Sequence, residues 1–176
     1  MSNLVAELLK PVTITPYSLE SLGVSITASG GSAVGAVVTA AYPAANDALF
    51  FPFRLSSPLL VVKMFASIGT GISGNIDVGI YSEAGTKLVS SGSTLQANDG
   101  AVQEFDITDT LLGVGLFYLG IAMDNATGTL LRGTTTNAQI LALLGAAKQA
   151  TAFPLPATAT FATMTAAYIP LFGLHG

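Results

Sequence analysis

The sequence predicts an all-β protein: an antiparallel β-sandwich of jelly-roll type with one short helix and extended terminal arms. Short apolar segments with a period of two recur along the middle of the chain. Turn residues, such as Asn98-Asp99-Gly100, separate these segments at close spacing. This spacing favours a sandwich or jelly roll over a βαβ fold. Within the 176 residues we expect an N-terminal arm over 1–35, a β-sandwich core over 36–132, and a short helix with a C-terminal strand or arm over 133–176 that completes the domain.

The N-terminal arm begins with a predicted short helix over residues 3–10. Asn3 can cap this helix and Pro11 ends it, while one apolar face is formed by Leu4, Val5, Leu8 and Leu9. Eight residues do not hold a helix alone in water, so we expect this end to dock on another surface. Residues 11–35 are rich in Ser and Gly and are expected to be extended.

The core is predicted to contain strands at 48–55, 59–68, 75–82, 87–91, 102–107, 116–123 and 127–132. Pro52 removes a ladder donor from the first of these, so that strand is expected at a sheet edge or a bulge. Residues 75–82 alternate, with Ile76, Val78 and Ile80 on one face and Asp77, Gly79 and Tyr81 on the other. The turn Glu83-Ala84-Gly85-Thr86 then predicts a hairpin.

A single helix is predicted after the core. Thr136 and Gln139 fit a capping box, and Gly145 fits the C-terminal cap. Its apolar face would consist of Ile140, Leu141 and Leu144. The tail, Thr151–Leu174, alternates loosely, and the sequence leaves open whether it is a late strand or a docking arm.

Charged residues make up only 9% of the chain, against about 25% in an ordinary soluble domain. A surface this poor in charge is usually covered by a membrane, by copies of the same chain or by another protein. Gly and Pro interrupt the uncharged stretches 21–46 and 149–176, so no transmembrane helix is expected. Residues 1–10 lack a cation before the apolar stretch, which argues against a signal peptide and for assembly in the cytoplasm. Six dispersed cations exclude a basic patch for nucleic acid.

The residues that most reactions require are missing. The chain has no cysteine, which excludes disulfides and thiolate metal sites, and its one histidine, His175, lies next to the end. Residues 69–74 match G-x-G-x-x-G, but a period-two segment follows, which predicts a loop and not a dinucleotide site. Acidic residues are expected in or beside turns, without the string of a calcium loop: Asp99, Glu104, Asp106, Asp109 and Asp124. We therefore predict no catalytic, cofactor-binding or metal-binding residue.

Adjacent aromatic residues indicate strands with two covered faces. Phe50 and Phe51 must point to opposite sides of a strand, as must Phe117 and Tyr118. One side faces the core, and the other faces a second layer or a partner. In a chain with so few charges, this pattern favours a multi-copy assembly. The interface candidates are Leu4, Val5, Leu8, Leu9, Phe51, Tyr168, Ile169, Leu171 and Phe172.

The segment Asn75-Ile-Asp-Val-Gly-Ile-Tyr-Ser-Glu-Ala-Gly-Thr-Lys-Leu-Val-Ser-Ser-Gly92 resembles a hairpin common in β-sandwich domains of tailed-phage structural proteins. Gly115-Leu-Phe-Tyr-Leu-Gly-Ile-Ala-Met-Asp124 is similar to a later strand of the same sandwich. The resemblance implies a virion protein: a capsid decoration protein, a head-fibre base or a tail component. It carries over no functional residue.

The leading hypothesis is a non-enzymatic structural protein of a phage particle. We expect it to self-associate as a trimer, to dock on other virion proteins, and to bury apolar surface from residues 1–24 and 149–174. It would use no cofactor, nucleic acid or membrane. The alternative is a module that binds a glycan or a host surface through loops 69–74, 96–101 and 124–127, with Asp99, Asn125 and Tyr81 as test residues. An enzyme such as a depolymerase is the third hypothesis.

Overall fold

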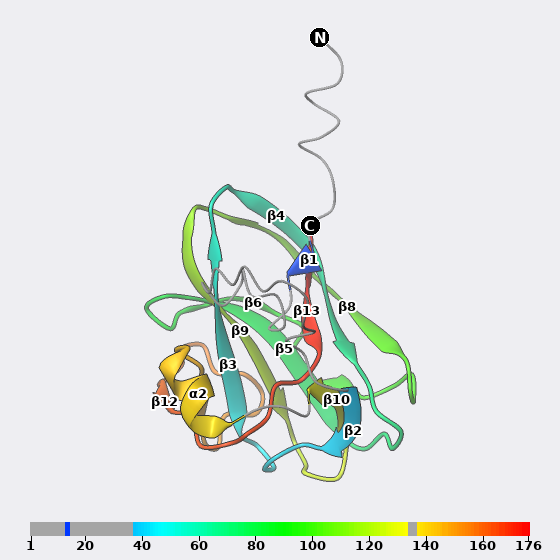
Figure 1. Cartoon of the computed structure of the whole chain (residues 1–176). Helices are drawn as coiled ribbons and strands as arrows, with labels where there is room; N and C mark the ends of the chain where they lie inside the picture. Colours follow the sequence, from blue (N-terminus) through cyan, green and yellow to red (C-terminus); the bar gives the residue numbers. More distant parts are fainter. Residues whose placement is uncertain (1–12, 15–36, 134–136) are drawn as a thin grey trace, which may run out of the picture.

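Antiparallel β-sheets and one short helix make up the computed structural model of the chain, which describes residues 13–14, 37–133 and 137–176 (Figure 1). The predicted helix at 3–10, most of the arm at 11–35, and Thr136 lie outside the described residues. All strand pairings in the described part are antiparallel. The all-β prediction is therefore confirmed for the part of the chain that the structure describes.

The strands form two large sheets and a ribbon. The four-stranded sheet has the order β1-β13-β4-β8, with β1 at Thr13–Ile14, β13 at Phe172–His175, β4 at Leu59–Ser67 and β8 at Val102–Leu112. The seven-stranded sheet has the order β12-β11-β3-β9-β5-β6, and β7 pairs with β5. Its bounds are β12 Ala162–Thr163, β11 Ala147–Gln149, β3 Ala48–Leu55, β9 Gly115–Met123, β5 Asn75–Ser82, β6 Lys87–Ser90 and β7 Thr94–Leu95. The ribbon pairs β2, Val37–Ala41, with β10, Thr129–Gly133.

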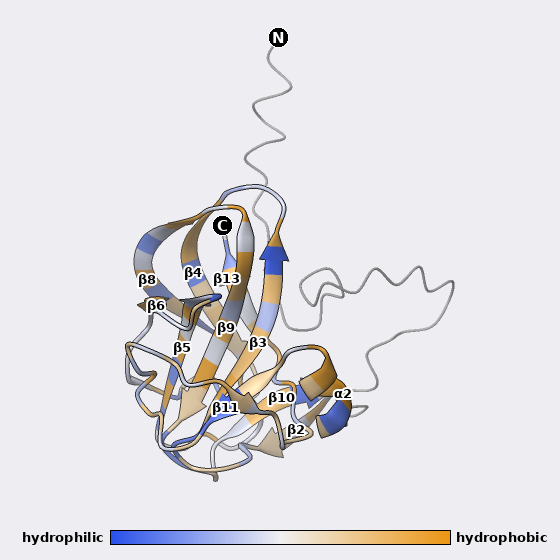
Figure 2. Ribbon diagram, turned by 90° about the vertical axis from the view of Figure 1, so that its left-hand side faces the viewer, coloured by the Kyte–Doolittle hydropathy of each residue, from blue (hydrophilic) through white to orange (hydrophobic). Residues whose placement is uncertain are grey.

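The main core lies between the two large sheets, giving a sandwich-like arrangement. Alternate residues of each strand enter it, as Ile76, Val78 and Ile80 do from β5. Apolar residues concentrate along the strands that face this interior (Figure 2). The alternation predicted for residues 75–82 is thus confirmed, and β5 has the predicted bounds.

The seven-stranded sheet carries a second apolar layer on its outer face. Phe50 and Tyr81 point to this face, and their rings meet edge to face with centroids 5.2 Å apart. Residues from the irregular segment 152–161 cover them, namely Ala152, Leu155, Ala159 and, at the margin, Phe153 and Phe161. The second face of the sheet is therefore covered by the chain itself. For these aromatic residues, the interpretation that they favour a multi-copy assembly was wrong.

Two glycines make room for this layer. Gly79 of β5 and Gly120 of β9 are register partners, and Phe50 of β3 lies opposite Gly120 on its other side. A Cβ on Gly79 would come within 3.0 Å of the Leu155 side chain and 2.8 Å of the Val89 carbonyl oxygen. A Cβ on Gly120 would come within 3.0 Å of Tyr81. Side chains in this row would displace the outer layer.

Pro52 lies where β3 becomes an edge strand. β11 pairs only with Ala48, Leu49 and Phe50 of β3, while β9 pairs with β3 along its whole length, Pro52 included. The missing N–H of Pro52 thus costs no ladder hydrogen bond in the described part of the chain. The prediction of an edge position is confirmed.

The short helix α2, Ala138–Leu143, begins one residue later than the predicted capping box implied. Asn137 is its N-cap, and its side-chain oxygen accepts from the Gln139 N–H. Gly145 follows the C-terminus with φ +85°, as predicted. Only Leu141 of the helix is buried, and Ile140 is exposed, because the helix rests on the sheet edge through one turn.

The two ends of the sandwich are different. The β3–β4 and β8–β9 turns lie at one end, which we call the apical end and which is uppermost in Figure 1. The loops 69–74, 96–101 and 124–128 lie at the opposite end, because β4 and β9 run there and β8 starts there. The C-terminus reaches the apical end through β13, whose His175 pairs with Lys63.

Candidate functional site

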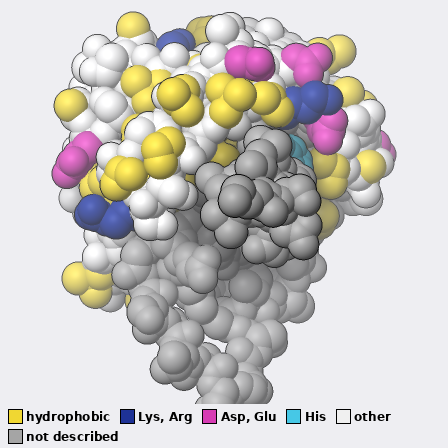
Figure 3. All heavy atoms as spheres, turned by 90° about the horizontal axis from the view of Figure 1, so that it is seen from above, with side chains coloured by type: hydrophobic (Ala, Val, Ile, Leu, Met, Phe, Trp, Pro, Cys, Tyr) yellow, Lys and Arg dark blue, Asp and Glu magenta, His cyan; other side chains and the backbone are white. Residues whose placement is uncertain are grey.

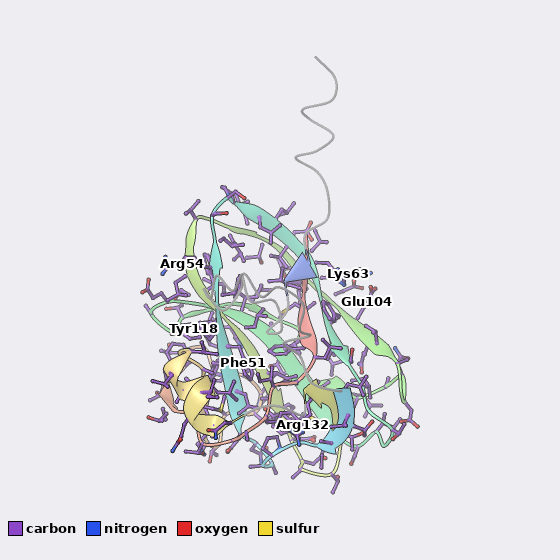
Figure 4. The ribbon with its side chains drawn as sticks, viewed as in Figure 1. Phe51, Arg54, Lys63, Glu104, Tyr118 and Arg132 are labelled. Carbon is purple, nitrogen blue, oxygen red and sulfur yellow. The ribbon has the colours of Figure 1, made fainter. Side chains whose placement is uncertain are left out.

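Three of the predicted interface residues, Phe51, Tyr168 and Phe172, belong to the core. Phe51 is 1% exposed, and its ring packs edge to face on Phe172 with centroids 5.8 Å apart. Phe51 projects from β3 into the space between the sheets (Figure 4). Phe172 enters the same core from β13. Their assignment to an interface was wrong, because the side of the strand that Phe51 occupies faces the chain's own second sheet.

Tyr168 is also held inside its own subunit. Its hydroxyl donates to the Ala40 carbonyl at 3.1 Å, and its ring packs on Tyr42. The Arg132 guanidinium lies over the same ring, 5.4 Å from the centroid, and donates to the Ala167 carbonyl. Tyr168 thus fastens the C-terminal segment to the β2–β10 ribbon and offers nothing to a partner.

The remaining C-terminal candidates, Ile169 and Leu171, are half-buried. The Leu171 N–H donates to the Leu131 carbonyl, and the Leu171 carbonyl accepts from the Ser67 N–H. The segment then continues as β13 in the four-stranded sheet. The tail was predicted to be either a late strand or a docking arm. In the structure it ends as a strand that pairs within its own subunit. Leu4, Val5, Leu8 and Leu9 lie outside the described residues.

Three large apolar side chains are exposed at the apical end, as others are at the loop end (Ile72, Leu95 and Val102) and on α2 (Ile140 and Leu143). Leu60 and Leu111 are cross-strand partners of β4 and β8 and are 49% and 71% exposed. Val114, in the β8–β9 turn, is 67% exposed. We call these three residues the apical patch. Seen from this end, hydrophobic side chains form a row beside charged ones (Figure 3). The patch is the apolar surface that a partner would find on this face.

Sequence reasoning missed the apical patch, although the signal was present. Leu59-Leu60 and Leu111-Leu112 are doublets at strand ends, and adjacent residues of a strand point to opposite faces. Leu112 is buried in the core, so Leu111 has to face outward. The same argument that placed Phe50 and Phe51 on opposite faces of a strand therefore predicts an outward-facing Leu111. Unlike Phe50, Leu111 is not covered by a second layer among the described residues.

The three loops proposed for glycan binding do meet at the end opposite the apical patch. The Asp99 carboxylate accepts from the Gly71 N–H at 2.7 Å, which joins loops 96–101 and 69–74. The Asp124 carboxylate accepts from the Asn75 N–H at 2.9 Å, and Asn125 donates to the Ser73 carbonyl at 2.8 Å. We call this group the loop cluster. Its polar groups mostly satisfy one another, while Ile72, Leu95 and Val102 are exposed at the same end.

Tyr81 does not belong to the loop cluster. It is buried on the outer face of the seven-stranded sheet, where its hydroxyl donates to the Pro156 carbonyl at 2.7 Å. Naming it as a test residue for glycan binding was therefore wrong. Asp99 and Asn125, by contrast, do lie in the cluster.

The predicted positions of three acidic residues in or beside turns were also wrong. Glu104, Asp106 and Asp109 lie within β8 and not in turns. Lys63 on β4 donates to Glu104 at 3.1 Å, and the two side chains lie side by side (Figure 4).

Among the described residues, no group of three His, Asp or Glu side chains is placed to hold a metal ion. The glycine-rich loop 69–74 is followed by β5, as predicted, and not by a helix.

Asp77 is a fully buried carboxylate that sequence reasoning did not single out. Its Oδ2 accepts from the Leu155 N–H at 3.0 Å, and the Ser91 hydroxyl lies 3.3 Å from its Oδ1. Lys87 Nζ donates to the Leu155 carbonyl at 2.7 Å. One peptide unit of the outer layer is therefore held from both sides. A lone acid in an apolar alternating strand was the available signal.

Burial raises the pKa of the Asp77 carboxyl above its ordinary value of 3.8, opposed by the Leu155 N–H, the Lys87 charge and the Ser91 and Ser90 hydroxyls. The folded protein then keeps this proton at pH values where the unfolded chain has lost it. Stability consequently falls as the pH rises from 3.8 through the folded-state pKa, and is constant above it. Each unit of elevation costs about 1.4 kcal/mol.

We predict that Asp77→Asn removes this pH dependence, because an amide keeps an acceptor for the Leu155 N–H and carries no charge. Denaturant unfolding across this range should show wild type losing stability relative to the variant as the pH rises. Asp109→Asn, which removes an exposed carboxylate from β8, is the matched control. A difference between wild type and Asp77→Asn that is constant with pH, or that changes in favour of wild type, would contradict the assignment.

No helix in the described part of the chain is long and apolar enough to cross a membrane. Comparisons with protein-family models, with curated proteins and with solved structures gave no match for this chain. No family therefore assigns a role to any of its residues, and its function has to be inferred from its own surfaces.

Proposed function

We propose that the chain is a non-enzymatic structural protein of a tailed-phage particle, a β-sandwich of jelly-roll type that self-associates as a trimer and docks on a particle lattice. The observation that carries the self-association and docking in this proposal is the apical patch. Leu60, Leu111 and Val114 are 49%, 71% and 67% exposed at one end of the molecule.

The composition of the apical end supports a contact with protein. Leu60 and Leu111 lie opposite each other, so they present one continuous apolar strip across β4 and β8. Charged side chains border the strip, among them Lys63 with its partner Glu104. An apolar centre with a charged margin is the usual anatomy of a protein–protein interface.

The particle assignment rests on the hairpin resemblance. Residues 75–92 form a hairpin: β5 is followed by a turn with Gly85 at φ +82°, and then by β6. The later segment 115–124 contains β9, which pairs with β5 in the same sheet. Localisation in a virion assembled in the host cytoplasm follows from this resemblance and remains part of the proposal.

We predict that the full chain is oligomeric and that Leu111→Asp or Val114→Asp weakens the oligomer. Burying such a side chain is worth about 1.5–3 kcal/mol, so each change should lower the association constant roughly tenfold or more. Sedimentation equilibrium measures this directly. Leu143→Asp, at an 87% exposed position of α2 away from the apical end, is the control and should leave the mass unchanged. A soluble monomer at all concentrations would refute self-association.

We also predict that the chain is a stoichiometric part of a particle. Particles purified on a density gradient from lysed cultures that produce the chain should contain it in a constant ratio to the major capsid protein. Quantitative mass spectrometry of gradient fractions gives this ratio. Finding the chain only in particle-free fractions would refute the virion assignment, even if the chain self-associates.

The loop cluster supports a second candidate function, the binding of a glycan or host surface. Three loops that are far apart in sequence are joined by hydrogen bonds at one end of the sandwich, which is where sandwiches often carry binding sites. Under this hypothesis a glycan array probed with the isolated chain should show defined ligands. Asp99→Ala should abolish that binding and the apical Val114→Asp should not. An array without ligands would dismiss this candidate and leave the first proposal unaffected.

A further inference from the structure

The strand β1 fixes where the N-terminal arm joins the sandwich. Thr13 pairs with His175 and Ile14 with Leu174, while His175 pairs in turn with Lys63. Thr13 is therefore closer than Ile14 to the apical end. It lies level with Lys63, which is three residues from Leu60 along β4. The twelve residues that precede Thr13 begin at the same end of the molecule as the apical patch.

The sequence of this arm matches an apolar surface. The sequence predicts a helix that begins after Asn3 and ends before Pro11, with one apolar face formed by Leu4, Val5, Leu8 and Leu9. A helix of eight residues is not stable in water without a surface to pack on. The apical patch, with two leucines and a valine in the open, is a surface of the right chemistry at the point where the arm begins.

Pro11 bears on whose patch the arm reaches. It has no N–H, so β1 cannot extend its ladder on β13 through this residue. It also restricts Lys10 to extended backbone conformations. An extended conformation at Lys10 would work against the sharp reversal that packing on its own apex requires.

The small area of the apical patch also favours an arm that reaches a neighbouring copy. A specific interface buries about 800 Å² on each partner. Three side chains fall well short of that, and an apex-to-apex contact would leave the apolar face of the arm uncovered. An exchange in which each copy gives an arm and receives one adds both surfaces to a single contact.

We propose that residues 4–9 of one copy dock on the apical patch of a neighbouring copy, so that the oligomer is held by exchanged arms. The inference rests on the proposed self-association and names the segment and the surface that carry it. The patch is the receptor and the arm is the ligand. Removing either partner therefore has the same effect on the oligomer.

The test uses the absence of cysteine from the chain. Leu8→Cys and Val114→Cys are made as separate proteins, mixed as full-length chains and oxidised under native conditions. A disulfide between the two proteins, located by mass spectrometry of the linked peptides, is the expected main product. Leu8→Cys mixed with Leu143→Cys is the matched control, since Leu143 is more exposed but lies on α2, and it should give only background cross-linking.

The double variant Leu8→Cys with Val114→Cys separates exchange from docking within one chain. An internal disulfide in a chain of monomer mass would overturn the exchange and place the arm on its own apex. An oligomer that forms without either cross-link would overturn the docking but leave self-association intact. A full chain that sediments as a monomer would overturn both, so the two failures are distinguishable.

Discussion

The constraint on which the structure depends is that its central strands are apolar on both faces. β3, β5 and β9 send one set of side chains into the space between the sheets and another set outward. A sheet of this kind needs two covering layers. The four-stranded sheet supplies one layer, and residues 152–161 supply the other as irregular backbone.

An irregular segment on an apolar face brings peptide groups that no ladder satisfies. This explains a buried acid in a chain with very few charges. Asp77 accepts from the Leu155 N–H and Lys87 donates to the Leu155 carbonyl. Further along, the backbone of Gly85 and Lys87 pairs with that of Ala159 and Ala157. The desolvation of Asp77 is the cost of holding this layer in place, and the glycines of β5 and β9 provide its room.

Local features of this fold could be predicted from the sequence, since they depend on neighbouring residues. The alternation at 75–82 gave the two faces of β5, and Pro52 gave the edge of β3. Partners distant in sequence could not be predicted. Phe51, Tyr168 and Phe172 were recognised as residues that need covering, but parity does not say whether the cover is the same chain or another. The apical patch was within reach of the same parity argument, whereas Asp77 depends on a segment 78 residues away.

The small share of charged residues is consequently explained in two ways. Most of the apolar side chains are covered by the chain itself, and a few remain exposed at the apical end. Part of the apolar surplus is absorbed by the outer layer, which hides Phe50 and Tyr81 without any partner. The C-terminal segment absorbs more of it, because Phe172 and Leu174 complete the core. What remains in the open at the apical end is a small surface, and it is small because the chain covers itself elsewhere.

The edges of the sheets then limit how copies can meet. In the described part of the chain β8 forms one edge of the four-stranded sheet, a long strand that invites pairing with another chain. It carries exposed Glu104, Asp106 and Asp109, and its pairing with β4 is broken by a register shift between Val61 and Lys63. Repeated acids and a bulge are features that oppose the addition of a strand from an identical copy. Association by sheet extension is therefore disfavoured at β8. The apical end, where apolar side chains are exposed near the start of β1, offers a contact between copies that needs no pairing of sheet edges.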